Sequence, residues 1–153
     1  MTSLLLEKLV TEVQRYQNRG FLHASMAVCA LVACADGEVS IEERYSIDYA
    51  IGHVDALQSF ETEEAIELLD DYIYQLRQGT PEARDTLYEK VRAFEGTYKR
   101  SRTLMRVAYL IINADRTVTP AEQQEFARLC ALLGLEADKL WQQIARQQGS
   151  RKS

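Results

Sequence analysis

The feature that most constrains the fold of this chain is a helix–loop–helix pattern that occurs twice, 79 residues apart. The first loop reads ADGEVSIEE over residues 35–43, and the second reads ADRTVTPAE over residues 114–122. The helices that lead into the loops match as well, with Met26, Val28, Leu31 and Ala35 pairing with Met105, Val107, Leu110 and Ala114. Such a unit cannot bury its apolar face alone, so we expect two pseudo-twofold-related halves around a central helix pair.

The rest of the chain is also helical in pattern, and no segment shows the convincing period-two alternation of a strand. The two prolines, Pro81 and Pro120, each follow a threonine, which is typical of a hydroxyl N-cap with proline at the first helical position. The sequence therefore predicts an all-α fold of about eight helices. The expected helices cover residues 3–17, 21–35, 41–54, 62–77, 81–95, 98–114, 120–133 and 136–148.

The length and composition indicate one globular domain. A chain of 153 residues with 46% hydrophobic and 27% charged residues is ordinary for a soluble protein. We expect a single domain over residues 1–148, with halves near 21–77 and 98–148, and a frayed tail over 149–153. No apolar run approaches the roughly 18 residues that cross a bilayer, and the leucines at 4–6 are followed at once by charges. We therefore expect a cytoplasmic protein without membrane insertion.

The negative charge of the chain is concentrated in one segment. Residues 36–71 carry twelve acidic residues and one basic residue, within a chain of net charge −5. An acidic chain is a poor ligand for nucleic acid, because that affinity rests largely on phosphate neutralisation, and it should instead attract metal ions or basic protein surfaces. Four tyrosines in or beside this segment are either interface anchors or packing residues at the edge of the core, namely Tyr45, Tyr49, Tyr72 and Tyr74.

The glutamates of both loops have a structural explanation. Ser40 with Glu43, and Thr119 with Glu122, fit the capping box, in which a hydroxyl accepts an amide of the helix and the glutamate returns to the cap residue's amide. Each cap contributes about 1 kcal/mol. Capping therefore accounts for Glu43 and Glu122 without a ligand, although it does not exclude one.

The aspartates of the loops are harder to explain by capping. Asp36 and Asp115 each end an apolar helix, where a carboxylate is unfavourable by up to about 1 kcal/mol unless a positive charge is near. Calcium or magnesium would supply that charge and prefers such hard oxygen ligands, with Glu38 as a further donor. The alternative is an aspartate that stabilises the turn through backbone contacts. In the second loop Arg116 replaces Gly37 at a cost of about 1 kcal/mol and Thr117 replaces Glu38, so the first loop is the better site. Either the second loop binds a cation weakly, or Arg116 takes the place of a metal by neutralising the nearby carboxylates.

Other chemistries find little support in the sequence. An EF-hand requires glycine at the sixth loop position and glutamate at the twelfth, and this chain has Ile41 and Ile47 there. There is no Ser-His-Asp candidate, no Gly-rich phosphate loop, and only two histidines, which lie in unrelated settings. We therefore expect neither enzymatic activity nor an organic cofactor.

Taken together, these segments resemble the tellurite-resistance TerB family and its wider TerB-like group, which includes the N-terminal domain of a membrane-anchored DnaJ-type co-chaperone. The resemblance is carried by RYQNRGF at 15–21, AVCA at 27–30 and the loop at 35–43, and it extends from about residue 8 to 141. It implies an all-helical fold of two pseudo-symmetric halves and a stress-response system that includes membrane proteins. It also implies metal chelation by the acidic loop residues, which fall here on Asp36, Glu43, Asp115 and Glu122.

Two hypotheses for function follow. In the first, the chain is a cytoplasmic metal-binding and interaction module, in which Asp36, Glu38 and Glu43 supply most of the cation affinity and Asp115 and Glu122 assist. In the second, it is a metal-free docking domain whose acidic segment binds a basic protein partner. The partner-binding residues expected on that segment are Glu42, Tyr45, Asp48 and Tyr49.

Overall fold

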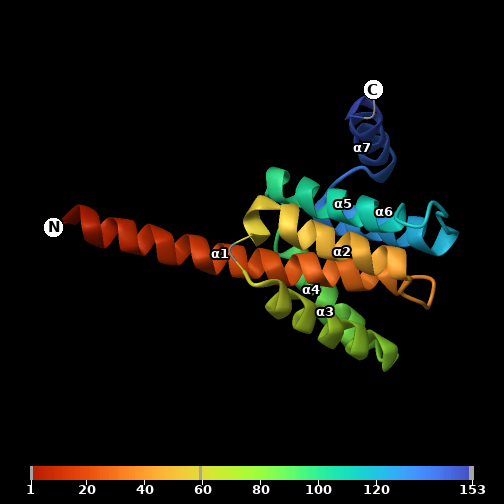
Figure 1. Cartoon of the computed structure of the whole chain (residues 1–153), viewed down its shortest axis with the longest axis horizontal. Coiled ribbons are helices and arrows are strands. Elements are labelled where there is room, and N and C mark those ends of the chain that lie inside the picture. Colours follow the sequence, from red (N-terminus) through yellow and green to blue (C-terminus); the bar gives the residue numbers. More distant parts are fainter. Residues whose placement is uncertain (1, 59, 152–153) are drawn as a thin grey trace.

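The computed structural model describes residues 2–58 and 60–151, and within them the chain forms seven α-helices, one short 3-10 helix and no strand (Figure 1). The α-helices are α1 (Thr2–Ala33), α2 (Ile41–His53), α3 (Thr62–Arg77), α4 (Pro81–Arg92), α5 (Tyr98–Ile112), α6 (Pro120–Leu133) and α7 (Ala137–Arg151), and the 3-10 helix η1 covers Asp55–Leu57. The all-α prediction is confirmed.

The main departure from the expected helices is at the N-terminus, where the segments 3–17 and 21–35 form one continuous helix of 32 residues. Gly20 lies inside this helix and does not adopt the left-handed backbone of the loop glycines. A glycine within a helix costs only about 0.5–1 kcal/mol, which the burial of the residues that follow it outweighs. At the other end, α7 runs to Arg151, and residues 152–153 of the expected tail lie outside the described residues.

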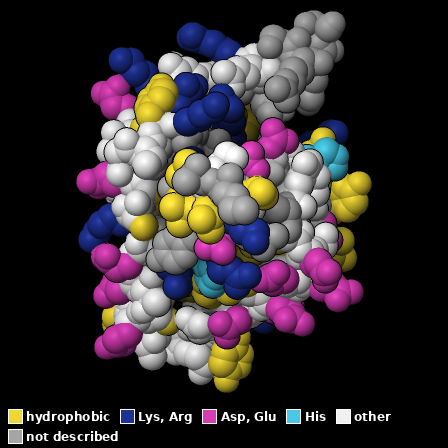
Figure 2. Space-filling view, turned by 90° about the vertical axis from the view of Figure 1, so that its left-hand side faces the viewer, with side chains coloured by type: hydrophobic (Ala, Val, Ile, Leu, Met, Phe, Trp, Pro, Cys, Tyr) yellow, Lys and Arg dark blue, Asp and Glu magenta, His cyan; other side chains and the backbone are white. Residues whose placement is uncertain are grey.

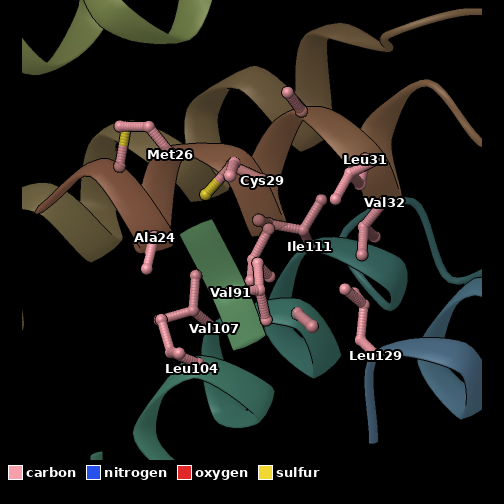
Figure 3. Packing of buried hydrophobic residues seen from close by; sticks show 14 of the residues in the cluster. Ala24, Met26, Cys29, Leu31, Val32, Val91, Leu104, Val107, Ile111 and Leu129 are labelled. Atoms are coloured by element: carbon pink, nitrogen blue, oxygen red, sulfur yellow. The ribbon is translucent and has the colours of Figure 1, made fainter. Parts of the chain in front are cut away.

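The second half of α1 is the centre of the fold. It packs against α5, as expected for the two incoming helices, and to a similar extent against α3 and α4. Small side chains allow this close approach, because Ala24, Ala27, Ala30 and Ala33 are all fully buried. Figure 3 shows Ala24, Cys29 and Leu31 of α1 above Leu104, Val107 and Ile111 of α5, with Val91 of α4 and Leu129 of α6 beside them.

Most of the paired positions of the two sequence copies have similar environments, although Leu31 is buried and Leu110 is only partly buried. Met26 and Met105 are fully buried, and Val28 and Val107 are 0% and 4% exposed. The matched apolar patterns thus serve the same purpose, which is to place each incoming helix in the core ahead of its acidic loop. The pseudo-twofold relation of the halves stays a prediction.

The first half of α1 projects from the bundle as a free helical arm (Figure 1). Its apolar side chains are exposed to between 47% and 71%, namely Leu4, Leu5, Leu6, Leu9, Val10 and Val13. None of the helices in the described part of the chain combines the length and the apolar character that a membrane span needs.

Candidate cation site at the paired acidic loops

The two acidic loops lie at the same end of the bundle, opposite the projecting N-terminus (Figure 1). One joins α1 to α2 and the other joins α5 to α6. Because α1 and α5 are packed together, loops 79 residues apart in sequence become neighbours in the fold. The fold therefore gathers the acidic residues of both copies at one end.

Both predicted capping boxes form. In the first, the Glu43 amide donates to Ser40 Oγ and the Ser40 amide donates to Glu43 Oε1, each at 3.0 Å. In the second, the Glu122 amide donates to Thr119 Oγ1 at 3.2 Å and the Thr119 amide donates to Glu122 Oε1 at 2.9 Å. The local sequence therefore fixes where α2 and α6 begin and turns each glutamate back beneath its loop.

The carboxyl groups of the capping glutamates are buried. Glu43 is 2% exposed and Glu122 is 1% exposed. Burial raises the pKa of Glu43, hydrogen bonds from Ser40 oppose that rise, and the nearby carboxylates of Asp36 and Glu122 add to it. Glu43 Oε2 is buried and has no hydrogen-bond partner in the described part of the chain. An unpartnered buried carboxylate oxygen is costly, and a bound cation would offset that cost.

The aspartates stabilise their own turns. Asp36 Oδ1 accepts the amide of Glu38 at 3.3 Å, and Asp115 Oδ1 accepts the amide of Thr117 at 3.1 Å. This is the structural alternative to a metal ligand, and it occurs in both copies. Both aspartates and Glu38 are nevertheless exposed, and these bonds use only one oxygen of each aspartate.

The backbone of the second loop repeats that of the first despite its different sequence. Gly37 has φ 95° and Arg116 has φ 63°, and Arg116 is the one non-glycine residue with positive φ among the described residues. The expected strain at Arg116 is therefore present, at about 1 kcal/mol. Its side chain also places a positive charge in a loop whose first copy has none.

The donors of these loops suit a hard cation, but they do not form a complete coordination group. Within residues 2–58 and 60–151, no three His, Cys, Asp or Glu side chains converge as metal ligands. Glu43 and Glu122 lie beneath the loops, and each uses one oxygen in its cap. The other expected ligands, Asp36, Glu38 and Asp115, are exposed above them. Coordination would require exposed carboxylates to turn toward Glu43.

The outer face of α2 carries the expected partner-binding residues. Tyr45 is 73% exposed and Tyr49 is 50% exposed, and Glu42 and Asp48 are also exposed on this helix. Sequence reasoning missed Ile41, which is 85% exposed. Its place directly after the Ser40 cap was the available signal, because the first residue of a capped helix has no packed turn before it.

The tyrosines near the acidic segment divide into two groups. Tyr74 is exposed like Tyr45 and Tyr49, whereas Tyr72 is 3% exposed and its hydroxyl lies 2.8 Å from His23 Nδ1. Tyr72 is thus a packing residue at the edge of the core, whereas Tyr45, Tyr49 and Tyr74 are exposed on the surface. Arg44, the single base of the acidic segment, pairs with Asp70 at 2.7 Å.

Comparison with known proteins agrees with the resemblance seen in the sequence. The family model of tellurite resistance protein TerB matches residues 22–145, which include both acidic loops. The tellurium resistance protein TerB of an Alcaligenes species is 34% identical over 67 residues, which is 44% of this chain and 55% of that protein. The match thus spans about half the length of this curated relative. No solved structure matches the chain.

Proposed function

The chain belongs to the TerB family, and from that premise we propose that it is a non-enzymatic module that binds a divalent cation at its paired acidic loops. Calcium and magnesium are the favoured ions, because the available donors are carboxylate oxygens. In this proposal the module acts in the cytoplasmic response to tellurite or related chemical stress. Its protein partners belong to a membrane-associated part of that response.

The observation that carries the proposal is the carboxylate of Glu43. It is buried, its Oε2 lacks a hydrogen-bond partner in the described structure, and two further carboxylates, of Asp36 and Glu122, disfavour its charge. Capping alone requires one oxygen of one glutamate, and an uncharged glutamine would cap equally well. A carboxyl group whose charge is disfavoured by this setting would be stabilised in its charged form by a bound cation.

The two loops would contribute unequally. Asp36, Glu38 and Glu43 from the first copy supply three carboxylates, and Asp115 and Glu122 from the second assist. Arg116 lowers the affinity of the second loop for a cation, since it adds a positive charge beside Asp115. Each loop also follows the carboxyl end of an apolar helix, where the helix dipole favours positive charge.

The test is a thermal melt of chelator-stripped protein with calcium, magnesium, manganese and zinc added separately. An ion at a hundred times its dissociation constant stabilises the fold by about 2.7 kcal/mol. That corresponds to a rise in Tm of roughly 5–10 °C for a domain of this size. We expect Asp36→Asn to abolish the rise and leave the fold intact, whereas Asp85→Asn, on the exposed face of α4, should leave the rise unchanged. A rise that persists in Asp36→Asn contradicts the proposal.

A metal-free docking domain is the second candidate, and the outer face of α2 favours it. Ile41, Tyr45 and Tyr49 are large, exposed and spaced about one helical turn apart, beside the acidic side chains of Glu42 and Asp48. A basic partner with an apolar strip would complement this face. Affinity purification in excess chelator distinguishes the candidates: a basic partner that is retained there, and lost in Tyr45→Ser, supports docking without metal.

A further inference from the structure

A pocket of about 640 Å³ lies between α1, α4 and α5, at the base of the N-terminal arm. Its polar wall is formed by Arg19, His23, Lys90 and Arg100, and Phe94 contributes an apolar wall. It is separated from the acidic loops by roughly 20 Å along α1. Figure 2 views the molecule from the side of the N-terminal arm, and basic and acidic side chains surround a histidine below the centre of the view.

The pocket has an excess of positive charge. Arg19 faces Glu64 at 3.9 Å, and both side chains are largely exposed. In the described part of the chain, no carboxylate lies within ion-pair distance of Lys90 or Arg100. The pKa of His23 is lowered, first by burial and then by the charges of Lys90 and Arg19, against a smaller opposing effect of Glu64. A cationic form of His23 is thus disfavoured by the same positive field that would attract an anion.

Arg100 is held in place and has donor capacity to spare. Its Nη2 donates to Asn18 Oδ1 at 2.9 Å, and its guanidinium lies over the Phe21 ring at 4.9 Å from the centroid. Its Nη1 is buried and has no hydrogen-bond partner among the described residues. A buried charged donor without an acceptor is costly, and a ligand in the pocket could satisfy it only if the guanidinium turned, because Nη1 itself has almost no accessible surface.

The apolar wall is equally well positioned. The Phe94 ring packs edge-on against Phe21, with centroids 5.6 Å apart and an interplanar angle of 81°. The Phe94 carbonyl accepts hydrogen bonds from the hydroxyls of Thr97 and Ser101, which fixes the turn between α4 and α5. The pocket therefore presents an ordered aromatic surface beside its cationic groups.

Gly20 lines the pocket and contributes no side chain to it. A glycine inside a helix costs about 0.5–1 kcal/mol relative to alanine. At Gly20 neither the backbone nor the packing requires glycine, because φ is not positive and an added Cβ would meet no atom within 4 Å. Because Gly20 lines the pocket, we expect a larger side chain at this position to occupy part of it.

We propose that this pocket binds a small organic phosphate, with the phosphate held by Lys90, Arg100 and Arg19 and the apolar body against Phe94. A phosphate monoester carries close to two negative charges and three strong acceptor oxygens. That matches cationic groups that come from three different helices, whereas a carboxylate has one charge for them to share. The volume lies within the range of small-molecule sites.

Calorimetric titration of the full chain with four probes tests the proposal. Phenyl phosphate should bind at least about tenfold more tightly than inorganic phosphate, which lacks the apolar body, and than benzoate, which has a single charge. Benzyl alcohol should show no binding. Failure of phenyl phosphate to bind, or equal affinity for phenyl phosphate and inorganic phosphate, overturns the proposal.

Variants locate the binding in this pocket. Lys90→Gln should weaken phenyl phosphate binding about tenfold, while the matched Lys99→Gln, an exposed lysine outside the pocket, should change it less than twofold. Gly20→Leu should raise the Tm and abolish binding, because leucine favours the helix and fills the pocket. Undiminished binding in a stable Gly20→Leu protein refutes the assignment. Glu43→Gln should bind phenyl phosphate like the unmodified protein, so this test is independent of the cation site.

Discussion

Replacing Arg116 by glycine should stabilise the protein, because Arg116 is held in the left-handed region at φ 63° while the equivalent Gly37 has φ 95°. A left-handed backbone costs a non-glycine residue about 1–2 kcal/mol. Glycine also gains freedom in the unfolded chain, which costs about 0.4–1 kcal/mol. The Arg116 side chain is exposed and forms no hydrogen bond or ion pair with the described residues, so no contact is lost. The expected net gain is about 0.5–1 kcal/mol, or roughly 1–4 °C in Tm.

Two further variants separate backbone strain from charge. Arg116→Gln removes the positive charge and keeps the strain, so the difference between the glycine and glutamine variants measures the relieved strain less the added unfolded-state freedom of glycine, without a contribution from charge. Gly37→Ala is the reverse change in the first loop, where an added Cβ would contact no atom within 4 Å. It should destabilise the protein by about 0.5–1 kcal/mol for the same backbone reason. Calorimetric melts at a fixed pH give the Tm of the three variants and of the unmodified protein. An Arg116→Gly protein no more stable than Arg116→Gln refutes the reasoning.

Three other outcomes follow from the structure. The pKa of Glu43 is raised in the folded state, so the folded form binds a proton more tightly than the unfolded form does. The free energy of unfolding should therefore fall as the pH rises above 4.5. Denaturant melts of Glu43→Gln at several pH values should lack this part of the pH dependence. The NMR titration of His23 should give a pKa below 6.5, and Lys90→Gln should raise it; no change between the two proteins would remove Lys90 as a cause. Ile111→Val should cost about 0.5–1.5 kcal/mol in chemical denaturation, since Ile111 is fully buried between α1 and α5, and a neutral effect would contradict the packing.

The sequence predicts most of the fold because its strongest signals are local. Ser40 with Glu43 and Thr119 with Glu122 specify the starts of α2 and α6 within four residues, and both caps form as expected. Gly37 and Arg116 likewise occupy the left-handed positions that the loop pattern requires. Each of these features depends on neighbours in sequence, so it can be recognised before any tertiary contact is known.

The features that could not be predicted depend on contacts between distant segments. The continuity of α1 through Gly20 follows from the burial of the helix that comes after it, not from the local residues. Tyr72 and Tyr45 look alike in sequence, yet the contact with His23 belongs to Tyr72 alone. The burial of Glu43 near Glu122 likewise requires both halves to be packed together. The sequence pattern identifies the candidate ligands, but it does not show which of their carboxylates are buried.

The most direct test of the cation proposal is a carbon-13 NMR titration of the Glu43 side-chain carboxyl, with and without saturating calcium or magnesium. In chelator-stripped protein the pKa of Glu43 should lie above its ordinary value of 4.5, because burial and the carboxylates of Asp36 and Glu122 oppose its charge. A cation bound at the paired loops favours the charged form, so its addition should lower this pKa. A Glu43 pKa that is the same with and without either ion would contradict the proposal.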